Sequence, residues 1–319
     1  MTKYHHWLVW LLVVFSGIGA SAQSADDAAK RDVEVLVVAG ASGADEYVKV
    51  FDAQVRLWQE AGEKAGATVN VIGRDERQDD ASALEETLKK ASGKEQGLFW
   101  LVLIGHGTFD GREPRLNLRG PDPTARQLGE WLKPVKREMV IIQGTSAAAG
   151  FLPFLGGKNR TVVTATKSAD EIFYARFGEH FAPAIAGGAE ADLNQDRQVS
   201  VLEAFLFASR KTAEFYEKAE RLATEHALLD DNGDGKGTRA EEFVENKPPD
   251  LQSDGNRAAQ LVLVLSEEER KLTETQRQNR DSLERKLEEL KAQRAALGEE
   301  AYYRDLEKLL RQLGQVYSP

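Results

Sequence analysis

The chain has 319 residues, with 52 acidic side chains against 42 basic ones and a formal net charge of −10 at pH 7. This acidic balance argues against nucleic acid as a partner, because binding to a phosphate backbone relies on clustered lysine and arginine. The chain has no cysteine. Disulfides, thiolate metal sites, lipoprotein attachment and thiol catalysis are therefore excluded together.

The first segment, residues 1–22, has the pattern of a secretory signal peptide. Lys3 precedes an apolar run over residues 7–15, and Ala20-Ser21-Ala22 matches an A-x-A cleavage site. The apolar run is shorter than the about 20 residues that cross a bilayer, which favours a cleaved signal over a membrane anchor. We therefore predict a periplasmic or secreted protein that has no contact with the membrane after signal removal.

The next segment, residues 32–190, alternates between buried strands and amphipathic helices. Continuous apolar runs predict strands over Val33–Gly40, 67–73, Leu98–Ile104, Met139–Ile142 and Arg160–Ala165. Apolar residues at helical spacing predict helices between them, over residues 47–66, around 83–88 and over 124–132. This alternation predicts an α/β fold with a mainly parallel sheet and flanking helices.

The remainder of the chain has a different pattern. Residues 191–245 read as helices joined by acidic loops, and 246–265 as a turn-rich linker with a late strand over 258–265. Residues 266–316 are highly charged, with leucines at heptad-like spacing that is broken near Gly298, and predict a helical hairpin. The apolar stripe is too short for a long coiled coil. The hairpin therefore either packs on its own domain or contacts a partner or a second copy of the chain.

Two strand ends carry residues suited to catalysis. LVLIGHGTFDG delivers His106 after the third strand, and VIIQGTSAAAGFL forms an elbow of small residues after the fourth. Both lie at the carboxyl edge of the expected sheet, where open α/β folds bind ligands. Ser146 or Thr145 is a candidate nucleophile with His106 as its base. The alternative is that the small residues only make a tight turn.

These two segments, followed by NRTVVTATKSADEIFYARFGEHFAPAI, resemble the caspase/legumain superfamily of cysteine peptidases over roughly residues 33–225. In that superfamily a histidine after the third strand acts with a cysteine after the fourth. The resemblance implies that His106 is the catalytic histidine and Gly107 the oxyanion glycine. Aligned on Gly150, the superfamily's Ala-Cys-x-Ser-Gly elbow puts Ala147 at the cysteine position; a shift of one residue puts Ser146 there.

Two acidic loops match the ligand spacing of an EF-hand calcium loop. The first has Arg197 at position 6, where glycine is usual, whereas the second has Gly235 there. The alternative for each loop is an Asx-rich surface turn without metal. The candidate ligands are Asp192, Asn194, Asp196, Gln198 and Glu203 in the first loop, and Asp230, Asn232, Asp234, Lys236 and Glu241 in the second. We predict Ca²⁺ at one or both loops, where it would brace the structure.

Three functions remain open at this point. The one we favour is an exported, calcium-braced pseudo-peptidase that binds a peptide or protein partner. The second is an active hydrolase that uses Ser146 or Thr145 with His106. The third is a scaffold that acts through the hairpin at residues 266–316, by which the chain could also self-associate.

Overall fold

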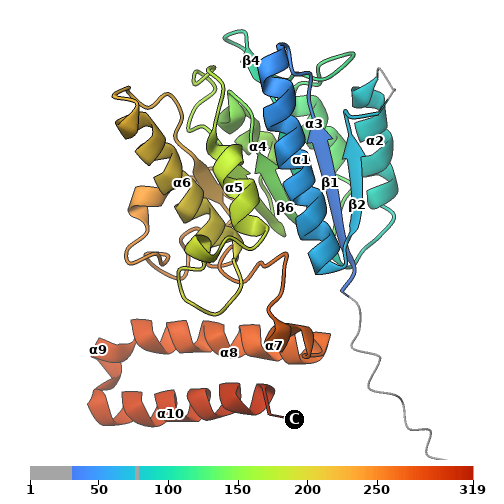
Figure 1. Cartoon of the computed structure of the whole chain (residues 1–319). Helices are drawn as coiled ribbons and strands as arrows, with labels where there is room; N and C mark the ends of the chain where they lie inside the picture. Colours follow the sequence, from blue (N-terminus) through green and yellow to red (C-terminus); the bar gives the residue numbers. More distant parts are fainter. Residues whose placement is uncertain (1–30, 76–78, 319) are drawn as a thin grey trace, which may run out of the picture.

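The computed structural model describes residues 31–75 and 79–318, so the predicted signal peptide lies outside the described residues. A central sheet lies between two layers of helices, and a helical hairpin lies beyond one end of that sheet (Figure 1). Within the described ranges, no helix combines the length and the apolarity that crossing a membrane requires.

The main sheet has seven strands in the order β2-β1-β3-β6-β7-β8-β9. The first five strands in this order are parallel, and β8 and β9 continue the sheet as antiparallel strands. The strands are β1 (Val33–Ala39), β2 (Thr68–Ile72), β3 (Leu98–Ile104), β6 (Glu138–Gln143), β7 (Arg160–Thr164), β8 (Leu228–Asp230) and β9 (Thr238–Arg239). The predicted α/β class with a mainly parallel sheet is confirmed.

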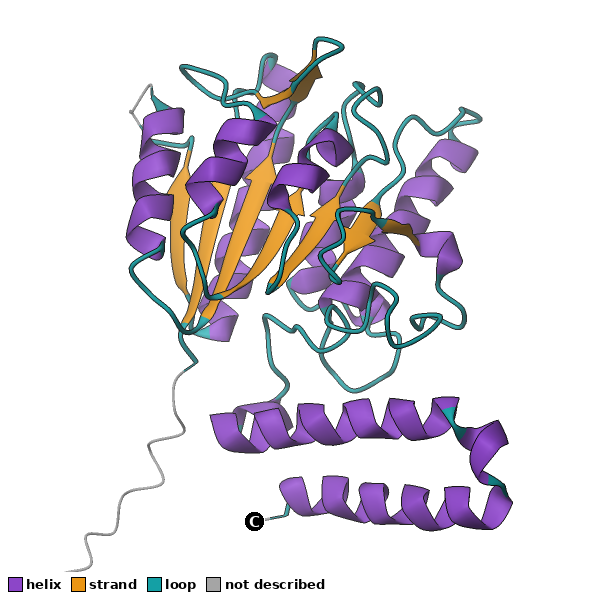
Figure 2. Ribbon diagram, turned by 180° about the vertical axis from the view of Figure 1, so that it is seen from behind, coloured by secondary structure: helices purple, strands orange, loops and turns teal. Residues whose placement is uncertain are grey.

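Alternate residues of the strands build two hydrophobic cores, one on each face of the sheet. Helices cover both of these faces (Figure 2). In β1, Val35 and Val37 point to one core and Leu36 and Val38 to the other, as the two-residue period of a strand requires. The first core is covered by α1 (Asp45–Ala65), α5 (Phe177–Ile185) and α6 (Val201–Lys218). The second is covered by α2 (Asp80–Ala91), α3 (Ala125–Leu132) and α4 (Leu152–Leu155).

Local sequence sets the ends of the predicted helices. α1 ends at Ala65 because Gly66 adopts the left-handed conformation, with φ 65° and ψ 23°. α3 begins after Thr124, whose side chain and that of Gln127 form a capping box. These two boundaries were readable from the sequence, since glycine and threonine are the residue types that such ends prefer.

The parallel strands all run toward the edge that carries His106. A short antiparallel hairpin, β4 (Gly107–Phe109) with β5 (Pro114–Leu116), follows His106 directly. It lies beyond the strand tips, at the opposite end of the sheet from the helical hairpin (Figure 1). This pair of strands could not be predicted from the sequence, because each strand has only three residues.

The prediction for residues 191–245 is wrong in part. The second acidic loop joins two strands, β8 and β9, rather than two helices. Leu228 and Leu229 are buried against the sheet, and this burial lets a three-residue segment extend it at β7. The first acidic loop is followed by α6 but is preceded only by a 3-10 turn, Ala189–Ala191. Neither loop therefore has the two flanking helices of a complete EF-hand.

The late strand predicted over residues 258–265 is also wrong. This segment makes turns, and a single isolated bridge joins Val262 to Ser200. The backbone amide of Ala259 donates to the carbonyl of Gly255, so the start of the segment is bonded to itself rather than to a neighbouring strand. Ala258, Leu261 and Leu263 are buried in the first core without being part of the sheet.

The C-terminal helices form the predicted hairpin with its break at Gly298, where φ is 76°. The hairpin consists of α7 (Glu267–Arg270), α8 (Glu274–Ala292), α9 (Arg294–Leu297) and α10 (Glu299–Val316). α8 and α10 pack through a small cluster of their own, formed by Leu272, Leu283 and Val316 with Leu309 and Leu313.

Candidate functional site

The histidine segment and the elbow are in direct contact at the carboxyl edge of the sheet. A Cβ atom placed on Gly107 would lie 2.2 Å from the carbonyl oxygen of Ser146 and 3.0 Å from Oγ1 of Thr145. Only a residue without a side chain fits between these backbones. The structure thus brings together Gly107 and Ser146, two of the residues that the sequence picked out.

The imidazole of His106 lies half-buried among aromatic rings. Its ring centroid is 4.6 Å from that of Tyr47, 5.4 Å from that of Phe51 and 5.6 Å from that of Tyr174. Burial lowers the pKa of His106, and the hydrogen bond to the carbonyl of Ser42 opposes this only in part. The ring is therefore neutral at neutral pH.

One hydrogen bond decides which nitrogen of His106 carries the proton. Nε2 lies 3.2 Å from the carbonyl oxygen of Ser42. A carbonyl oxygen can only accept, so Nε2 carries the hydrogen of the neutral ring and Nδ1 is its acceptor. His106 can thus receive a hydrogen bond or a proton at Nδ1.

The elbow after β6 is strained at Ala147, one of the two residues, with Ser146, at which the sequence comparison would place a nucleophile. Ala147 has φ 55° and ψ 20°, the left-handed conformation that alanine rarely adopts. Its backbone amide donates to the carbonyl of Glu171 over 2.8 Å, which holds it there. Strain of this kind gathers at functional sites. Here a methyl group occupies the strained position.

The hydroxyl groups of the elbow face inward. Thr145 is fully buried, and its Oγ1 lies 3.2 Å from Oε1 of Gln143 and 3.0 Å from the carbonyl oxygen of Ser146. Ser146 is 1% exposed. None of the hydrogen bonds found among the described residues joins His106 to either hydroxyl. A serine or threonine nucleophile stays a prediction, and it would require the elbow to rearrange.

Glu171 and His226 are residues of this edge that the sequence analysis missed. Oε1 of Glu171 lies 2.6 Å from Nδ1 of His226, and Oε2 accepts the backbone amides of Lys167 and His226. The Glu171 side chain thereby links the loop after β7 to the chain segment before β8. The backbone carbonyl of Glu171 accepts the hydrogen bond from the amide of Ala147. The two residues are far apart in sequence, and no local pattern marks their pairing.

An exposed apolar pair lies between Glu171 and Tyr174. Ile172 is 53% exposed and Phe173 is 66% exposed. Glu171 contacts the elbow and Tyr174 contacts His106. Ile172 and Phe173 therefore belong to the segment that connects the two parts of the site. Neighbouring apolar side chains that are exposed to solvent are a common feature of binding surfaces.

The first acidic loop has the backbone path of a calcium loop. Arg197 adopts φ 69°, the conformation for which glycine is usual at position 6. The carboxylate of Asp192 accepts the backbone amides of Asp196 and Arg197. Glu203 accepts the amides of Leu193 and Asn194 and forms a capping box with Ser200 at the start of α6.

The second acidic loop has the same internal hydrogen-bond arrangement, with one accepting residue changed. Asp230, at the end of β8, accepts the amides of Gly233 and Gly235. The place that Glu203 fills in the first loop is taken by Asp254, which accepts the amides of Asp231 and Asn232. Sequence spacing had given this place to Glu241.

The structure places Glu241 outside that loop. Its side chain is 69% exposed and pairs with Arg239 over 3.0 Å. Asp254 was missed because it follows Asp230 by a longer interval than the EF-hand pattern allows. Asp254 also accepts a hydrogen bond from Oγ1 of Thr238 over 2.7 Å, which ties it to β9.

Charge accumulates in the second loop. Burial, together with the charges of Asp254 and Asp234, raises the pKa of Asp230 to about 6. The hydrogen bonds that Asp230 accepts from two backbone amides oppose this rise only in part. Burial likewise raises the pKa of Asp254. Over residues 31–75 and 79–318, however, no group of three or more histidine, aspartate or glutamate side chains is arranged to hold a metal ion. Calcium binding stays a prediction. It requires these carboxylates to exchange their hydrogen bonds with backbone amides for coordination of the ion.

Comparison with known proteins finds similarity at the level of structure. No protein-family model matches the chain, and no curated protein matches it. The chain is similar to the initiator caspase Dronc from Drosophila, with 13% identity and a TM-score of 0.41 over 66% of this chain and 83% of that one. It is also similar to caspase-1 from Spodoptera frugiperda, with 10% identity and a TM-score of 0.40 over 63% of this chain and 86% of that one. At these identities the likeness is one of general fold.

Proposed function

We propose that this chain is a pseudo-peptidase of the caspase/legumain type, which binds a peptide or protein segment at the His106 edge and does not hydrolyse it. The observation that carries the proposal is the methyl group of Ala147 at the strained position of the elbow. A methyl group cannot attack a carbonyl carbon, and the chain has no cysteine that could replace it.

The hydroxyl groups next to Ala147 do not supply a better nucleophile. A serine or threonine hydroxyl reacts only when a base lies within hydrogen-bonding reach, at about 2.6–3.2 Å. Oγ1 of Thr145 faces Gln143 and the Ser146 carbonyl instead, and Ser146 is closed off from solvent. Hydrolysis at this edge would therefore need the elbow to open.

The bound segment is expected to present an apolar side chain to Ile172 and Phe173. Both residues lie in the chain between Glu171, which contacts the elbow, and Tyr174, which contacts His106. Both side chains are exposed, so burying them against a partner is favourable. A backbone amide of the same segment can donate to Nδ1 of His106. This pairing of an apolar surface with one fixed acceptor is the usual way in which a site gains both affinity and orientation.

A binding experiment with matched variants tests this assignment. The protein is immobilised and exposed to a mixed peptide library, and the retained peptides are sequenced. We expect peptides with large apolar side chains to be retained, and Phe173→Ala to reduce their retention about tenfold. Tyr303→Ala removes an exposed aromatic ring from α10, far from this edge, and is expected to change nothing. Equal retention by Phe173→Ala and the unchanged protein would contradict the proposal.

The proposal includes calcium at the acidic loops. Three observations support it: the left-handed conformation of Arg197 at position 6, the matching role of Glu203 and Asp254, and the raised pKa of Asp230. Calcium would then stabilise the end of β8 and the start of α6 and take no part in chemistry. The expected setting is the periplasm or the exterior of the cell, which rests on the signal pattern of residues 1–22.

A further inference from the structure

A large cleft lies between the body of the protein and the C-terminal hairpin, at the other end of the molecule from His106. Its volume is about 1650 Å³, and its walls are the first acidic loop, the loop over residues 245–256, and one side of α8. Pockets for small ligands are usually about 300–1,000 Å³. The lining of α8 runs from Arg280 to Ala292, which spans about 18 Å, or about five residues of an extended chain.

The lining of this cleft is acidic. Eight carboxylate side chains and five cationic side chains face it. Three of the cations are already engaged: Arg197 pairs with Glu268 over 2.7 Å, Arg280 with Glu269 over 2.5 Å, and Lys291 with Glu288 over 2.6 Å. The excess of carboxylates leaves the cleft negative.

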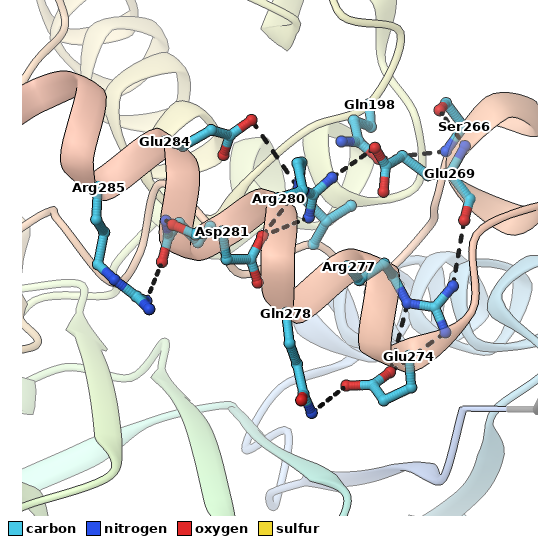
Figure 3. Close-up of polar contacts among 12 residues, drawn as sticks. Gln198, Ser266, Glu269, Glu274, Arg277, Gln278, Arg280, Asp281, Glu284 and Arg285 are labelled. Atoms are coloured by element: carbon cyan, nitrogen blue, oxygen red, sulfur yellow. Dashed lines mark hydrogen bonds and ion pairs between the residues drawn. The ribbon is translucent and has the colours of Figure 1, made fainter. Parts of the chain in front are cut away.

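The charge excess is concentrated around one guanidinium. Figure 3 shows Arg280 lying among Glu269, Asp281 and Glu284. Arg280 pairs with Asp281 over 2.7 Å, and its Nε is 3.9 Å from Oε1 of Glu284. Tyr317 adds a hydrogen bond to Oε1 of Glu269 over 2.7 Å. Three carboxylates therefore share one cationic partner.

A buried oxygen in this cluster has no partner. Glu269 is 4% exposed, and its Oε2 accepts no hydrogen bond among the described residues, although Glu269 lines the cleft. A buried carboxylate oxygen without a donor is costly, and native structures rarely keep one unless a ligand or water supplies the donor. Burial and the charges of Asp281, Glu269 and Asp196 raise the pKa of Glu284 to about 7, against the effect of Arg280.

We propose that this cleft binds a lysine- or arginine-rich segment of a partner polypeptide, with one cationic side chain donating to Glu269 and Glu284. The missing donor at Glu269 and the excess of carboxylates call for a cation that carries N–H groups. The length of the lining along α8 favours an extended chain over a small molecule. This site is separate from the His106 edge and does not depend on the function proposed there.

The test uses fluorescence anisotropy with two labelled hexapeptides, one alternating lysine with alanine and one alternating glutamate with alanine. We expect the lysine peptide to bind at low ionic strength and the glutamate peptide not to bind. Glu284→Gln is expected to weaken binding of the lysine peptide about fivefold. Since 46% of the Glu284 side chain is exposed, this variant should fold. Glu300→Gln removes an exposed carboxylate from α10, outside the cleft, and is the matched control.

The result that supports the proposal is weaker binding in Glu284→Gln with unchanged binding in Glu300→Gln. Absence of lysine-peptide binding would overturn the proposal, and so would an equal effect of both substitutions. Loss of peptide binding in Phe173→Ala would instead assign that binding to the His106 edge.

Discussion

Replacing Gly107 with alanine tests the contact between the histidine segment and the elbow. The added Cβ would lie 2.2 Å from the carbonyl oxygen of Ser146, whereas carbon and oxygen normally approach to about 3.3 Å. One of the two backbones must therefore move by roughly 1 Å. Both are packed against buried residues, so we expect Gly107→Ala to lower the free energy of unfolding by about 2–3 kcal/mol.

Urea denaturation measures this loss, provided that the m-value is unchanged. Gly314→Ala is the control, because a Cβ at this position in α10 meets nothing within 4 Å. Alanine is the better helix former, so the control should gain up to about 1 kcal/mol. The two substitutions are thus expected to have opposite signs. A loss below about 0.5 kcal/mol in Gly107→Ala would refute the close approach of His106 and the elbow.

Three further predictions concern calcium, pH and the hairpin. Calcium at about 100 times its dissociation constant should stabilise the protein by about 2.7 kcal/mol. In thermal melts, Asp230→Asn and Asp254→Asn should remove most of this stabilisation, whereas Glu241→Gln should leave it intact. If Glu241 rather than Asp254 holds the ion, Glu241→Gln will remove the stabilisation and Asp254→Asn will not. Affinity for the lysine hexapeptide should rise between pH 6 and pH 8, because the pKa of Glu284 is about 7 and its charged form is the one that binds; a flat profile in anisotropy titrations would count against this role. Leu283→Ala should destabilise the hairpin by about 2–3 kcal/mol. Amide hydrogen exchange of α8 and α10 measures this loss. Protection equal to that of the unchanged protein would show that the small leucine cluster does not hold the two helices together.

Most of the parallel sheet was predictable from the sequence because its strands are continuous apolar runs. Leu98–Ile104 is buried at every residue, and its predicted bounds agree with those of β3. The hairpin break was predictable for a similar reason, since Gly298 interrupts two long charged helices. The short strands were not predictable, because β8 and β9 together supply only five residues and depend on the edge of β7.

The candidate site was predictable only where its residues follow strands. His106 and the elbow stand at strand ends, so topology alone brings them to one edge of the sheet. Glu171 with His226, and Asp230 with Asp254, come together through tertiary packing between segments that no local spacing relates. For the same reason the hydrogen bond from His106 to the carbonyl of Ser42 could not be predicted from the sequence.

The central claim is that the His106 edge binds without hydrolysis, and hydrolysis itself is its most direct test. The protein and His106→Ala are incubated with a mixed fluorogenic peptide library, each with calcium and with a chelator. We predict the same background signal from both proteins in both conditions. Hydrolysis by the unchanged protein that is lost in His106→Ala would contradict the claim, because Ser146 or Thr145 would then act as the nucleophile.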